Sequence, residues 1–566
     1  MSKIIKTRPY SQQQVAALAS AGLNPLLAQL LVARGVTSHQ EIENGLKHLI
    51  PPNQLLNNDW MAKHLAACIA QQRKVLVIGD YDADGATATA VAVKGLRGMG
   101  AQVDFLVPNR FEYGYGLTPE IVNLAQQYSP DVILTVDNGI ASVEGVERAN
   151  DLGIEVLITD HHLPADVTPQ ATCIVNPNQR GCDFPSKHLA GVGVMFYVLL
   201  ALRAELIAQG HMRASQPYPL AELLDLVALG TVADLVKLDH NNRILVEQGL
   251  RRIRAGACCV GVQAILKSAG RDMRKANAQD LGFYVGPRLN AAGRLDDMTL
   301  GIRCLLAESM PEAMQYADQL HRLNSERRQI EEEMKQDAFA DLDTETVSQG
   351  YSICVFQPEW HQGVIGILAS RIKEQFHRPV IAFASAGDGL LKGSGRSIPG
   401  LHLRDALDLV TKRYPKLIIK FGGHAMAAGL SIHEANFVQF KQAFETVVAD
   451  LIGEADLQEA LETDGALEVS AMTMEIAQLL ETQVWGQGFP PPMFVDTFKV
   501  LQQRVLGDKH LKLQLQKEHM RFEAIYFNQP NLLPEQVKIV YQLQINEYNG
   551  QQQVQLQVKH AEAKFA

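Results

Sequence analysis

Residues 74–85 read KVLVIGDYDADG, and this stretch decides the fold. The apolar run at residues 75–78 is typical of a strand buried on both faces of a parallel sheet. It ends abruptly in three carboxylates at alternate positions, Asp80, Asp82 and Asp84. Clustered carboxylates beside a buried strand repel one another and therefore predict a bound cation. For this stretch alone, the alternative is an acidic surface turn.

Two further apolar runs, residues 131–136 and 155–159, end in the same way. The polar residues that follow them are Asp137, Asp160, His161 and His162. In open α/β sheets, ligands bind at the carboxyl ends of the strands, so these side chains are expected to meet there. Helical stretches between the runs favour right-handed crossovers and a parallel sheet. A later apolar, helix-like run ends at Asp234.

The composition indicates a soluble protein of several domains. Its 566 residues correspond to about three to four domains of ordinary size. Hydrophobic residues make up 47% and charged residues 20% of the chain, as in ordinary globular proteins. The net charge of −10 excludes a bulk-basic nucleic-acid binder but leaves room for a local basic groove.

The same composition predicts a cytoplasmic location. No run of 18 or more apolar residues occurs, so we expect no membrane span. The N-terminal residues lack the apolar core of a secretory signal. The seven cysteines are scattered and form no CxxC pair, which fits a reducing compartment and argues against a zinc ribbon.

The patterns predict a multidomain α/β protein. Its expected parts are a lead-in at residues 1–60 that packs on the next domain, a parallel-sheet domain at 61–305, a long connecting helix at 306–345 (residues 309–343 by pattern), a smaller α/β domain at 346–454 and a β domain at 455–566. In the last part, apolar residues alternate with polar ones, and Asn549 with Gly550 signals a hairpin turn. This part is expected to be an antiparallel barrel of the oligonucleotide-binding (OB) type.

Two glycine-rich elements, residues 393–397 and 421–429, are candidates for phosphate contact. Their candidate residues are Ser394, Arg396, Gly422, Gly423 and His424. Glycines let backbone amides approach a phosphate closely, and Arg396 can add a bidentate contact. Both elements could equally be tight turns, and His424 could simply close its turn.

A basic cluster occupies residues 242–275 of this acidic protein. Its members are Arg243, Arg251, Arg252, Arg254, Lys267, Arg271, Arg274 and Lys275. A solvated helix face and a nucleic-acid contact are the two interpretations that the pattern leaves open.

Together the motifs resemble the DHH phosphoesterase superfamily. Residues 80–84, Asp137, residues 160–162 and Asp234 are similar to its four motifs, and residues 422–429 look like its DHHA1 partner domain. The order of DHH domain, long helix, DHHA1 domain and OB-like domain resembles the RecJ family of exonucleases. The segments PRLNAAGR (residues 287–294) and WGQGFP (residues 485–490) resemble further segments of that family.

The resemblance implies an enzyme that degrades single-stranded DNA 5′→3′ to mononucleotides, in DNA recombination and repair. It implies two divalent ions, Mn²⁺ or Mg²⁺. Carboxylates suit both metals, and an imidazole favours Mn²⁺ over Mg²⁺. The implied partners are single-stranded DNA, a single-strand-binding protein and a RecQ-type helicase. A monomer without membrane contact is expected.

The resemblance also implies roles for single residues. Asp80 and Asp82 are expected to hold one ion, with Asp137 as the bridge to the other. The second ion is expected to be held by Asp84, His161 and Asp234. Asp160 is expected to orient a ligand histidine, and His162 to face the phosphate. A satisfied core histidine is the alternative for His161.

The expected DNA contacts are Arg288, Asn290, Arg294, Ser394, Arg396, Gly422, Gly423 and His424. For the arginines, ion pairs at a domain interface are the alternative. Two other functions compete with the nuclease. A DHH enzyme for pyrophosphate, short oligonucleotides or cyclic dinucleotides would resemble relatives that are generally shorter and lack the OB-like domain. A non-catalytic replication scaffold would have lost the acidic set.

Overall fold

The computed structural model describes residues 3–342, 347, 349–548 and 550–563. The chain forms two compact units. The larger unit comprises Thr7–His321 and Glu462–Ala566, and the smaller one comprises Met1–Lys6 and Arg322–Leu461.

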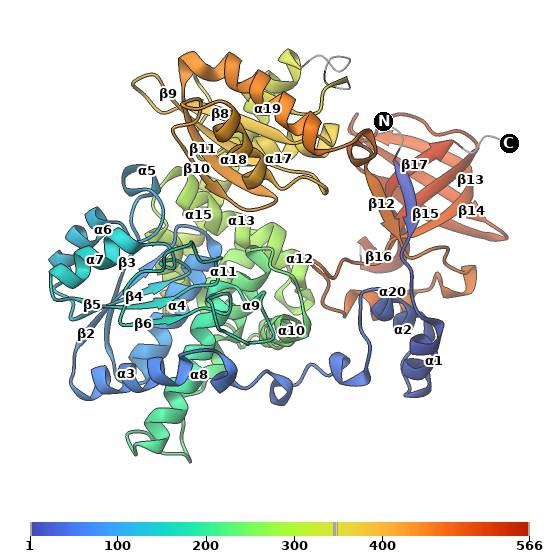
Figure 1. Cartoon of the computed structure of the whole chain (residues 1–566). Coiled ribbons are helices and arrows are strands. Elements are labelled where there is room, and N and C mark those ends of the chain that lie inside the picture. Colours follow the sequence, from blue (N-terminus) through green and yellow to red (C-terminus); the bar gives the residue numbers. More distant parts are fainter. Residues whose placement is uncertain (1–2, 343–346, 348, 549, 564–566) are drawn as a thin grey trace. The chain divides into compact units, whose positions relative to one another are not determined.

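A five-stranded parallel sheet organises the larger unit (Figure 1). Its strands are β2 (Lys74–Gly79), β3 (Gln102–Leu106), β4 (Val132–Val136), β5 (Glu155–Thr159) and β6 (Cys173–Val175). They lie in the order β3-β2-β4-β5-β6, and every neighbouring pair is parallel. Residues 75–78 are at most 2% exposed. The predicted parallel sheet with a doubly buried strand is therefore confirmed.

Helices cover both faces of this sheet. One face packs on α3 (Asn58–Ala70), α4 (Ala83–Gly98) and α8 (Gly191–Ala208), and the other on α6 (Pro119–Ala125) and α7 (Val143–Asp151). A short helix, α5 (Arg110–Tyr113), precedes α6. Asp82 caps α4 by accepting a hydrogen bond from the Gly85 N–H at 2.9 Å. A Cβ on Gly85 would lie 2.5 Å from the Asp80 carbonyl oxygen, so only glycine permits this tight entry into α4.

α8 has the length and the mean hydropathy, 1.8, of a membrane-spanning helix, and among the described helices it alone does. The sequence predicts no membrane-spanning segment when only uninterrupted apolar runs are counted. α8 is not such a run, because Arg203 and Glu205 interrupt it. Within the fold, 67% of its residues are buried, and it packs against α3, α4 and α9 (Leu224–Ala233). α8 is therefore a core helix of this unit.

Further helices follow along the chain. They are α10 (His240–Arg254), α11 (Val260–Ser268), α12 (Ala278–Asp280), α13 (Gly286–Leu295), α14 (Thr299–Leu306) and α15 (Met310–Asp341). The last of them, α15, contains the division between the two units at His321 and Arg322. The 32 residues of α15 agree with the helix predicted over residues 309–343, of which residue 343 lies outside the described residues.

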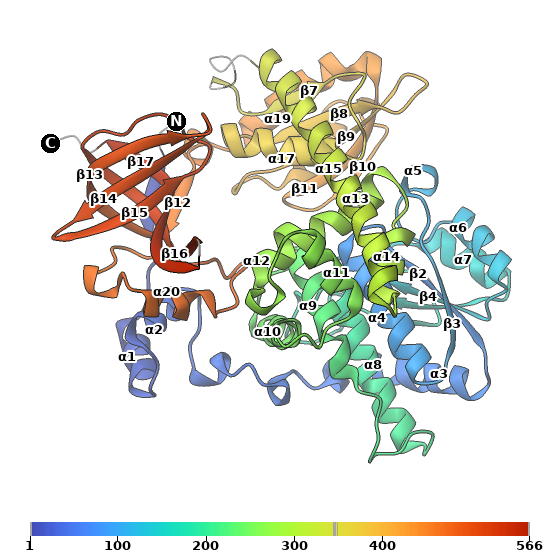
Figure 2. The ribbon, with the colours of Figure 1, turned by 180° about the vertical axis from the view of Figure 1, so that it is seen from behind.

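The smaller unit contains a mixed five-stranded sheet (Figure 2). Its strands are β7 (Ile353–Phe356), β8 (Val380–Ser385), β9 (Leu390–Arg396), β10 (Lys420–Gly423) and β11 (Ala427–His433). The order is β10-β11-β9-β8-β7, and only β7 and β8 are parallel. The helices of this unit after α15 are α17 (Ile365–Phe376), α18 (Leu403–Arg413) and α19 (Phe437–Leu451). The predicted smaller α/β domain is thus confirmed as a fold.

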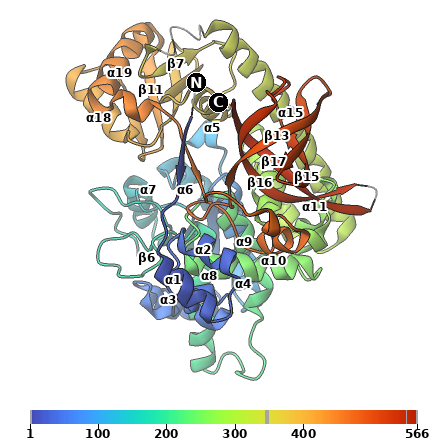
Figure 3. The same ribbon diagram turned by 90° about the vertical axis from the view of Figure 1, so that its right-hand side faces the viewer.

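The C-terminal residues form a closed barrel (Figure 3). Its strands are β13 (Phe494–Leu506), β14 (His510–Lys517), β15 (Met520–Tyr526), β16 (Gln536–Tyr548) and β17 (Gln551–Ala563). Leu511, Leu513 and Leu515 are at most 1% exposed, as their alternation predicts. The predicted antiparallel barrel is confirmed: four of its neighbouring pairs are antiparallel, and one pair, β15 and β17, is parallel. A barrel with an odd number of strands cannot close through antiparallel pairs alone. The expected turn residue Asn549 lies outside the described residues.

The lead-in contacts more than the domain on which it is predicted to pack. Its helices are α1 (Gln12–Ser20) and α2 (Pro25–Val32), and Leu30 of α2 belongs to the barrel core. Arg34 donates two hydrogen bonds of 2.9 Å to the buried carboxylate of Asp464. Only the later part of the lead-in reaches the helical domain, where His240 Nε2 lies 3.0 Å from the Glu43 carbonyl oxygen. β1 (Ile4–Thr7) pairs with β12 (Ala460–Thr463), and α20 (Met474–Glu481) precedes the barrel.

Candidate metal centre

The predicted acidic and histidine residues meet at one edge of the parallel sheet. The strand order reverses between β2 and β4, and such a switch point opens a crevice at the carboxyl ends of the strands. Three groups of side chains lie there, each with its candidate ligand atoms within 4.8 Å of one another. They are Asp80, Asp82 and Asp137; Asp84, His161 and Asp234; and Asp137, His161 and His162.

Backbone groups far along the chain position Asp84. Its two carboxylate oxygens accept hydrogen bonds from the N–H groups of Gly191 at 2.6 Å and Val192 at 2.9 Å. These N–H groups begin α8, and the positive end of the helix dipole favours a carboxylate there. A Cβ on Gly191 would lie 2.5 Å from the Asp137 Cβ, so glycine lets the start of α8 reach both acids.

The carboxylates repel one another in this buried setting. Burial raises the pKa of Asp84 to about 7, and the charge of Asp82 adds to the effect. The pKa of Asp137 is raised well above its ordinary value, first by burial and then by Asp84 and Asp82. Burial and the same two neighbours also raise the pKa of Asp234. Bound cations would remove this repulsion, so the electrostatics fit a metal site.

The donor atoms suit hard divalent ions. Asp137 Oδ1 is buried and accepts no hydrogen bond from the described residues. It lies 3.1 Å from His161 Nε2, which is also 3.5 Å from Asp234 Oδ2 and 3.9 Å from Asp84 Oδ2. Carboxylate oxygens with one imidazole are ligands that Mg²⁺ and Mn²⁺ accept. The residues therefore fit the metal that the sequence predicts.

Asp160 organises the histidine pair, though not in the expected way. Its Oδ1 accepts the N–H groups of His161 at 2.7 Å and His162 at 3.1 Å, and it lies 2.7 Å from Nδ1 of His162. The ring that Asp160 orients is thus that of His162, whereas at His161 it reaches only the backbone. Burial opposes protonation of His162, but Asp160 outweighs it and raises the pKa of His162 to about 9.

α13 supports the acidic turn rather than presenting free polar groups. Asn290 was expected to contact DNA, but its Oδ1 accepts a hydrogen bond from the Ala83 N–H at 2.8 Å. Arg288 is 7% exposed; it donates to the Tyr284 carbonyl oxygen at 2.7 Å and lies 3.1 Å from His321 Nδ1. Arg294, also expected to contact DNA, is half-buried in the last turn of α13.

The remaining expected DNA contacts lie together in the smaller unit. Arg396 ends β9 and donates to Ser394 Oγ at 3.2 Å. A Cβ on Gly366 would lie 2.9 Å from both Arg396 Nη2 and Ser394 Oγ, which places these groups beside the N-terminal turn of α17. Within the described part of the chain, Arg396 has no carboxylate partner, in contrast to the ion-pair alternative.

The second glycine-rich element is a hairpin turn next to this arginine. Gly422 pairs with Gly429 and Gly423 with Ala428, while Ala427 pairs with Arg396. The His424 N–H closes the turn by donating to the Ala427 carbonyl oxygen at 2.8 Å. For residues 421–429, the tight-turn interpretation therefore describes the backbone correctly. The imidazole of His424 is exposed in the turn between β10 and β11, two strands of the sheet that also contains Arg396.

Comparisons with known proteins agree with this arrangement. Three family models match the chain: the DHH family N-terminal domain at residues 74–231, the DHHA1 domain at 349–450 and the RecJ OB domain at 463–560. The single-stranded-DNA-specific exonuclease RecJ of Salmonella typhimurium is 50% identical over 552 residues, which cover 95% of each chain. The chain belongs to the RecJ family.

Solved RecJ structures have the same fold. The crystal structure of RecJ from Thermus thermophilus in complex with Mn²⁺ matches with a TM-score of 0.82 and 30% identity, covering 100% of this chain and 80% of that one. The complex of the same protein with Mg²⁺ matches with a TM-score of 0.78, 30% identity and coverages of 100% and 78%. The family and fold class predicted from the sequence are confirmed.

Sequence reasoning missed Tyr115 at the edge of the candidate metal centre. Its hydroxyl lies 3.2 Å from Nδ1 and 3.3 Å from Nε2 of His162, and its ring packs edge-on against Tyr81. Gly114 and Gly116, at φ +77° and +78°, flank it and turn the loop over the site. The sequence signal was the Gly-Tyr-Gly triplet, because paired glycines often mark left-handed backbone.

The basic cluster is largely structural. Arg243 is buried and donates to the carbonyl oxygens of Leu238 and Glu41, with its guanidinium 4.3 Å from the centre of the Phe489 ring. The ion pairs of the cluster are Arg251 and Arg254 with Glu247, Arg271 with Asp280, Arg274 with Asp272, and Lys275 with Glu547. We therefore base no DNA contact on this cluster.

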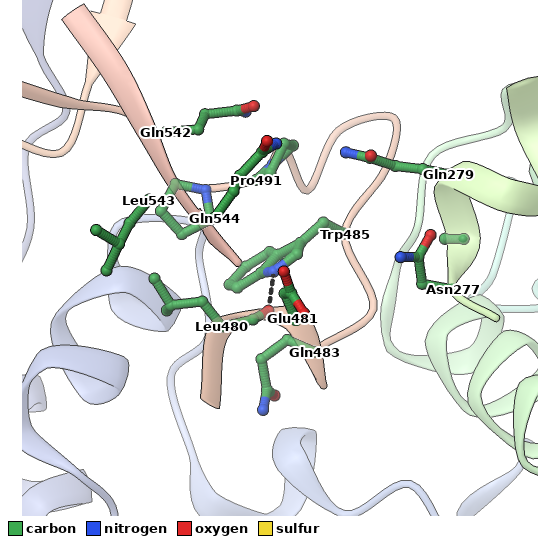
Figure 4. A pocket seen from close by; sticks show the side chains of 12 residues that line it. Asn277, Gln279, Leu480, Glu481, Gln483, Trp485, Pro491, Gln542, Leu543 and Gln544 are labelled. Carbon is green, nitrogen blue, oxygen red and sulfur yellow. Dashed lines mark hydrogen bonds between the residues drawn. The ribbon is translucent and has the colours of Figure 1, made fainter. Parts of the chain in front are cut away.

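The WGQGFP segment also has a packing role. Figure 4 shows Trp485 in a cleft between α12 and β16, where its Nε1 donates to the Leu480 carbonyl oxygen at 2.7 Å. The Trp485 ring stacks on Phe489 at 5.5 Å between centroids. The cleft is lined by amides such as Gln279 and Gln544 and by no basic side chain, so it offers no phosphate site.

Proposed function

We propose that this chain is a metal-dependent exonuclease that degrades single-stranded DNA 5′→3′ to 5′-mononucleotides in DNA recombination and repair. The observation that carries the proposal is the convergence of five aspartates and two histidines at the switch point of the sheet, in a chain of the RecJ family. Its domain division is the one predicted, with the DHH domain at residues 61–305 and the DHHA1 domain at 346–454. We also propose a cytoplasmic monomer with a single-strand-binding protein and a RecQ-type helicase as partners.

The geometry supports a division of roles among the residues. Asp80 and Asp82 would hold one ion and Asp84, His161 and Asp234 the other. Asp137 would be shared, because it groups with Asp80 and Asp82 and also with His161, a ligand of the second set. Bound divalent ions supply charge stabilisation at the phosphate and a hydroxide at neutral pH. His162, held by Asp160 and protonated near neutral pH, would donate to a phosphate oxygen rather than bind metal.

The barrel favours a polymeric substrate over the small-substrate alternative. A binding module with outward basic side chains gains affinity only when a strand extends beyond the cleavage site. The intact acidic set likewise argues against a non-catalytic scaffold, because a scaffold has no need of mutually repelling buried carboxylates.

The deciding experiment is digestion of single strands labelled at one end or the other, with Mn²⁺ or Mg²⁺. We expect mononucleotides from the 5′ end and little cleavage of duplexes. Release from the 3′ end, or endonucleolytic fragments, would contradict the proposed polarity. Hydrolysis confined to dinucleotides or pyrophosphate would favour the small-substrate alternative.

Deleting the barrel would be a poor test of its role, since Leu30 and Arg34 of the lead-in lose their partners with it. The outward face of β13–β15 offers point variants instead. Arg504 lies opposite Lys512, and Arg521 lies opposite Gln516, on the face away from the buried leucines. We expect R504A/R521A to weaken binding to a long single strand several-fold and to flatten its salt dependence, because each lost phosphate contact lowers the slope by about 0.7.

Cleavage of short oligonucleotides should be retained in R504A/R521A, since none of the proposed metal ligands changes. Lys63→Ala, an exposed lysine on α3, is the matched control and should keep the wild-type salt dependence. Equal long-strand affinity and an unchanged salt slope in the folded double variant would remove the barrel face from the DNA path.

Arg396→Ala tests how the enzyme selects a strand end. The guanidinium, Ser394 and the start of α17 can converge on one terminal phosphate, which would hold that end of the strand. We expect the variant to lose most of the preference for 5′-phosphorylated over 5′-hydroxyl strands, by about tenfold or more, because a bidentate phosphate contact contributes about 1.5–3 kcal/mol. The measurement is the ratio of kcat/KM for the two substrates.

Arg413→Ala provides the control for this ratio, since Arg413 pairs with Asp450 on the same unit and is exposed. It should behave as wild type. Metal affinity should be unchanged in both variants. A wild-type preference that survives intact in Arg396→Ala would show that another residue reads the end.

A further inference from the structure

The two histidines of the metal centre, His161 and His162, lie after β5 in neither a helix nor a strand. Each polar backbone group of the pair is nevertheless bonded to a side chain. Asp160 Oδ1 accepts both N–H groups. The His161 carbonyl oxygen accepts a hydrogen bond from Asn178 Nδ2 at 2.6 Å. The His162 carbonyl oxygen accepts one from Asn176 Nδ2 at 2.9 Å. Both asparagines belong to the loop that connects β6 to α8.

This β6–α8 loop, residues 176–190, is cross-linked by its own polar groups. Asn178 Nδ2, which holds the His161 carbonyl oxygen, also donates to the Lys187 carbonyl oxygen at 3.2 Å. The Lys187 ammonium donates to two further carbonyl oxygens of the loop, those of Pro177 at 2.7 Å and Cys182 at 2.5 Å. Because Asn178 stands near the start of the loop and Lys187 near its end, these bonds tie its two ends together.

The loop leads directly to the groups that hold Asp84. α8 begins at Gly191, shortly after Lys187, and its first two N–H groups, those of Gly191 and Val192, bind the Asp84 carboxylate at 2.6 and 2.9 Å. Asp84 and His161 belong to the same candidate metal group. One short loop therefore contacts His161 at its start and continues into the support of Asp84 at its end.

The proposed ligands of the other ion stand on a different segment. Asp80 and Asp82 lie between β2 and α4, where Asp82 caps the helix and Asn290 of α13 accepts the Ala83 N–H. Groups that orient metal ligands without touching the ion typically contribute a factor of about 10–100 in metal affinity. The β6–α8 loop is thus placed to affect one ion site more than the other.

We propose that the β6–α8 loop positions the ligands of the second ion, with Asn178 and Lys187 as positioning residues. Asn178 fixes the backbone from which the His161 imidazole projects. Lys187 keeps that contact in register with the start of α8, and so with Asp84. This inference rests on the metal-dependent function proposed above, and it adds that the two ions depend on separate supports.

The test is isothermal titration calorimetry of Mn²⁺ into the metal-free chain, for which we expect two bound ions in the wild type. Asn178→Ala and Lys187→Met should each weaken one ion by about tenfold or more and leave the other within about twofold. Pulsed electron paramagnetic resonance of the bound Mn²⁺ adds a spectroscopic signature. At a Mn²⁺ concentration that just saturates the wild type, the nitrogen coupling from His161 should decrease in both variants.

Asn150→Ala is the matched control. Asn150 Nδ2 on α7 donates to the Gln170 carbonyl oxygen at 3.1 Å, a bond of the same kind as that of Asn178. It lies before the start of β5, whereas the metal centre follows the end of that strand, so both ions should bind as in the wild type. Melting temperatures in EDTA report whether each variant has folded.

Two unchanged affinities in either folded variant would overturn the proposal, and so would an equal loss for both ions, since the loop would then support the whole centre. A melting temperature far below wild type in both variants would also overturn it, by making the loop contacts a matter of general stability. A wild-type chain that binds no Mn²⁺ would instead refute the metal-dependent function itself, and this inference with it.

Discussion

Replacing Asp137 by asparagine is expected to lower kcat by about 10³-fold or more, without loss of fold stability. Asp137 belongs to two of the three candidate metal groups, so the change weakens both proposed ion sites at once. Metal ions contribute several kcal/mol of transition-state stabilisation, and each 1.36 kcal/mol corresponds to about a factor of ten in rate.

The stability part of this expectation follows from the electrostatics. Burial, and then Asp84 and Asp82, raise the pKa of Asp137 well above its ordinary value. A carboxyl with a raised folded-state pKa is destabilising once the pH exceeds its unfolded value of about 3.9, because the unfolded chain then ionises more readily. Asparagine has the same shape without the charge, and it tolerates the φ of +61° at this position. The melting temperature in EDTA should therefore stay equal or rise.

The assay pairs turnover on a single strand with thermal melting. Asp104→Asn is the control, since this exposed carboxylate on β3 lies outside all three metal groups and should change neither quantity. A folded Asp137→Asn variant with near-normal turnover would refute the shared-ligand role. A melting temperature several degrees below wild type would instead show that Asp137 is needed for the fold.

The strands and their terminal acids were predictable because both signals are local. A doubly buried strand leaves a continuous apolar run, and Asp80, Asp137 and Asp160 follow such runs directly. The geometry of a parallel sheet then brings them together without further information. The same holds for the barrel, whose alternation of buried and exposed residues is visible along each strand.

Contacts between distant segments were not predictable in this way. The N–H groups that hold Asp84 lie 107 and 108 residues later in the chain. Nothing near Asn290 in sequence shows that its amide oxygen caps the backbone of Ala83. The parallel closure of the barrel likewise depends on strand number and connectivity rather than on residue pattern.

The buried face of the long helix α15 includes polar residues, which an apolar pattern does not predict. An apolar stripe along this helix includes Leu323 and Ile330, yet both are only half-buried. Asn324, Arg327 and Glu331 are at most 9% exposed and take that face instead. Their charges are compensated: Arg327 pairs with Glu331 and bonds to Asn324, and Glu331 also pairs with Arg371 at 2.8 Å. These paired polar residues recur at the 3.6-residue spacing of a buried helix face. A sequence pattern based on apolar residues alone does not detect them.

Removal of the metal is expected to abolish nuclease activity, and Mn²⁺ or Mg²⁺ should restore it. The clustered carboxylates and His161 offer ligands that both ions accept. Because the ions would bind the folded chain and neutralise its repelling acids, they should also raise the melting temperature. At a hundredfold excess over Kd the gain is about 2.7 kcal/mol per site, or on the order of 5 °C for a unit of this size.

The gain in melting temperature should depend on pH, and the sign follows from Asp84. The pKa of this carboxyl is raised from 3.8 to about 7, so the metal-free folded chain retains a proton there that the unfolded chain releases. The metal-free protein should therefore lose stability as the pH rises from about 4 to about 7. Metal binding needs the deprotonated acid and strengthens over the same range. The difference in melting temperature between excess Mn²⁺ and EDTA should thus widen from about pH 5 to about pH 8.

Differential scanning fluorimetry in matched buffers measures this widening, and Asp137→Asn supplies the comparison, because its weakened sites should give a smaller gain at every pH. Three outcomes would contradict the metal centre as described: full activity in EDTA, rescue by Zn²⁺ alone, or a gain that stays constant across the pH range. The last of these would be the most informative, since it would mean that the ions bind without displacing a proton from Asp84. The buried carboxyl held by Gly191 and Val192 would then be a structural cap for α8, and His161 and Asp234 would need another partner for their ion.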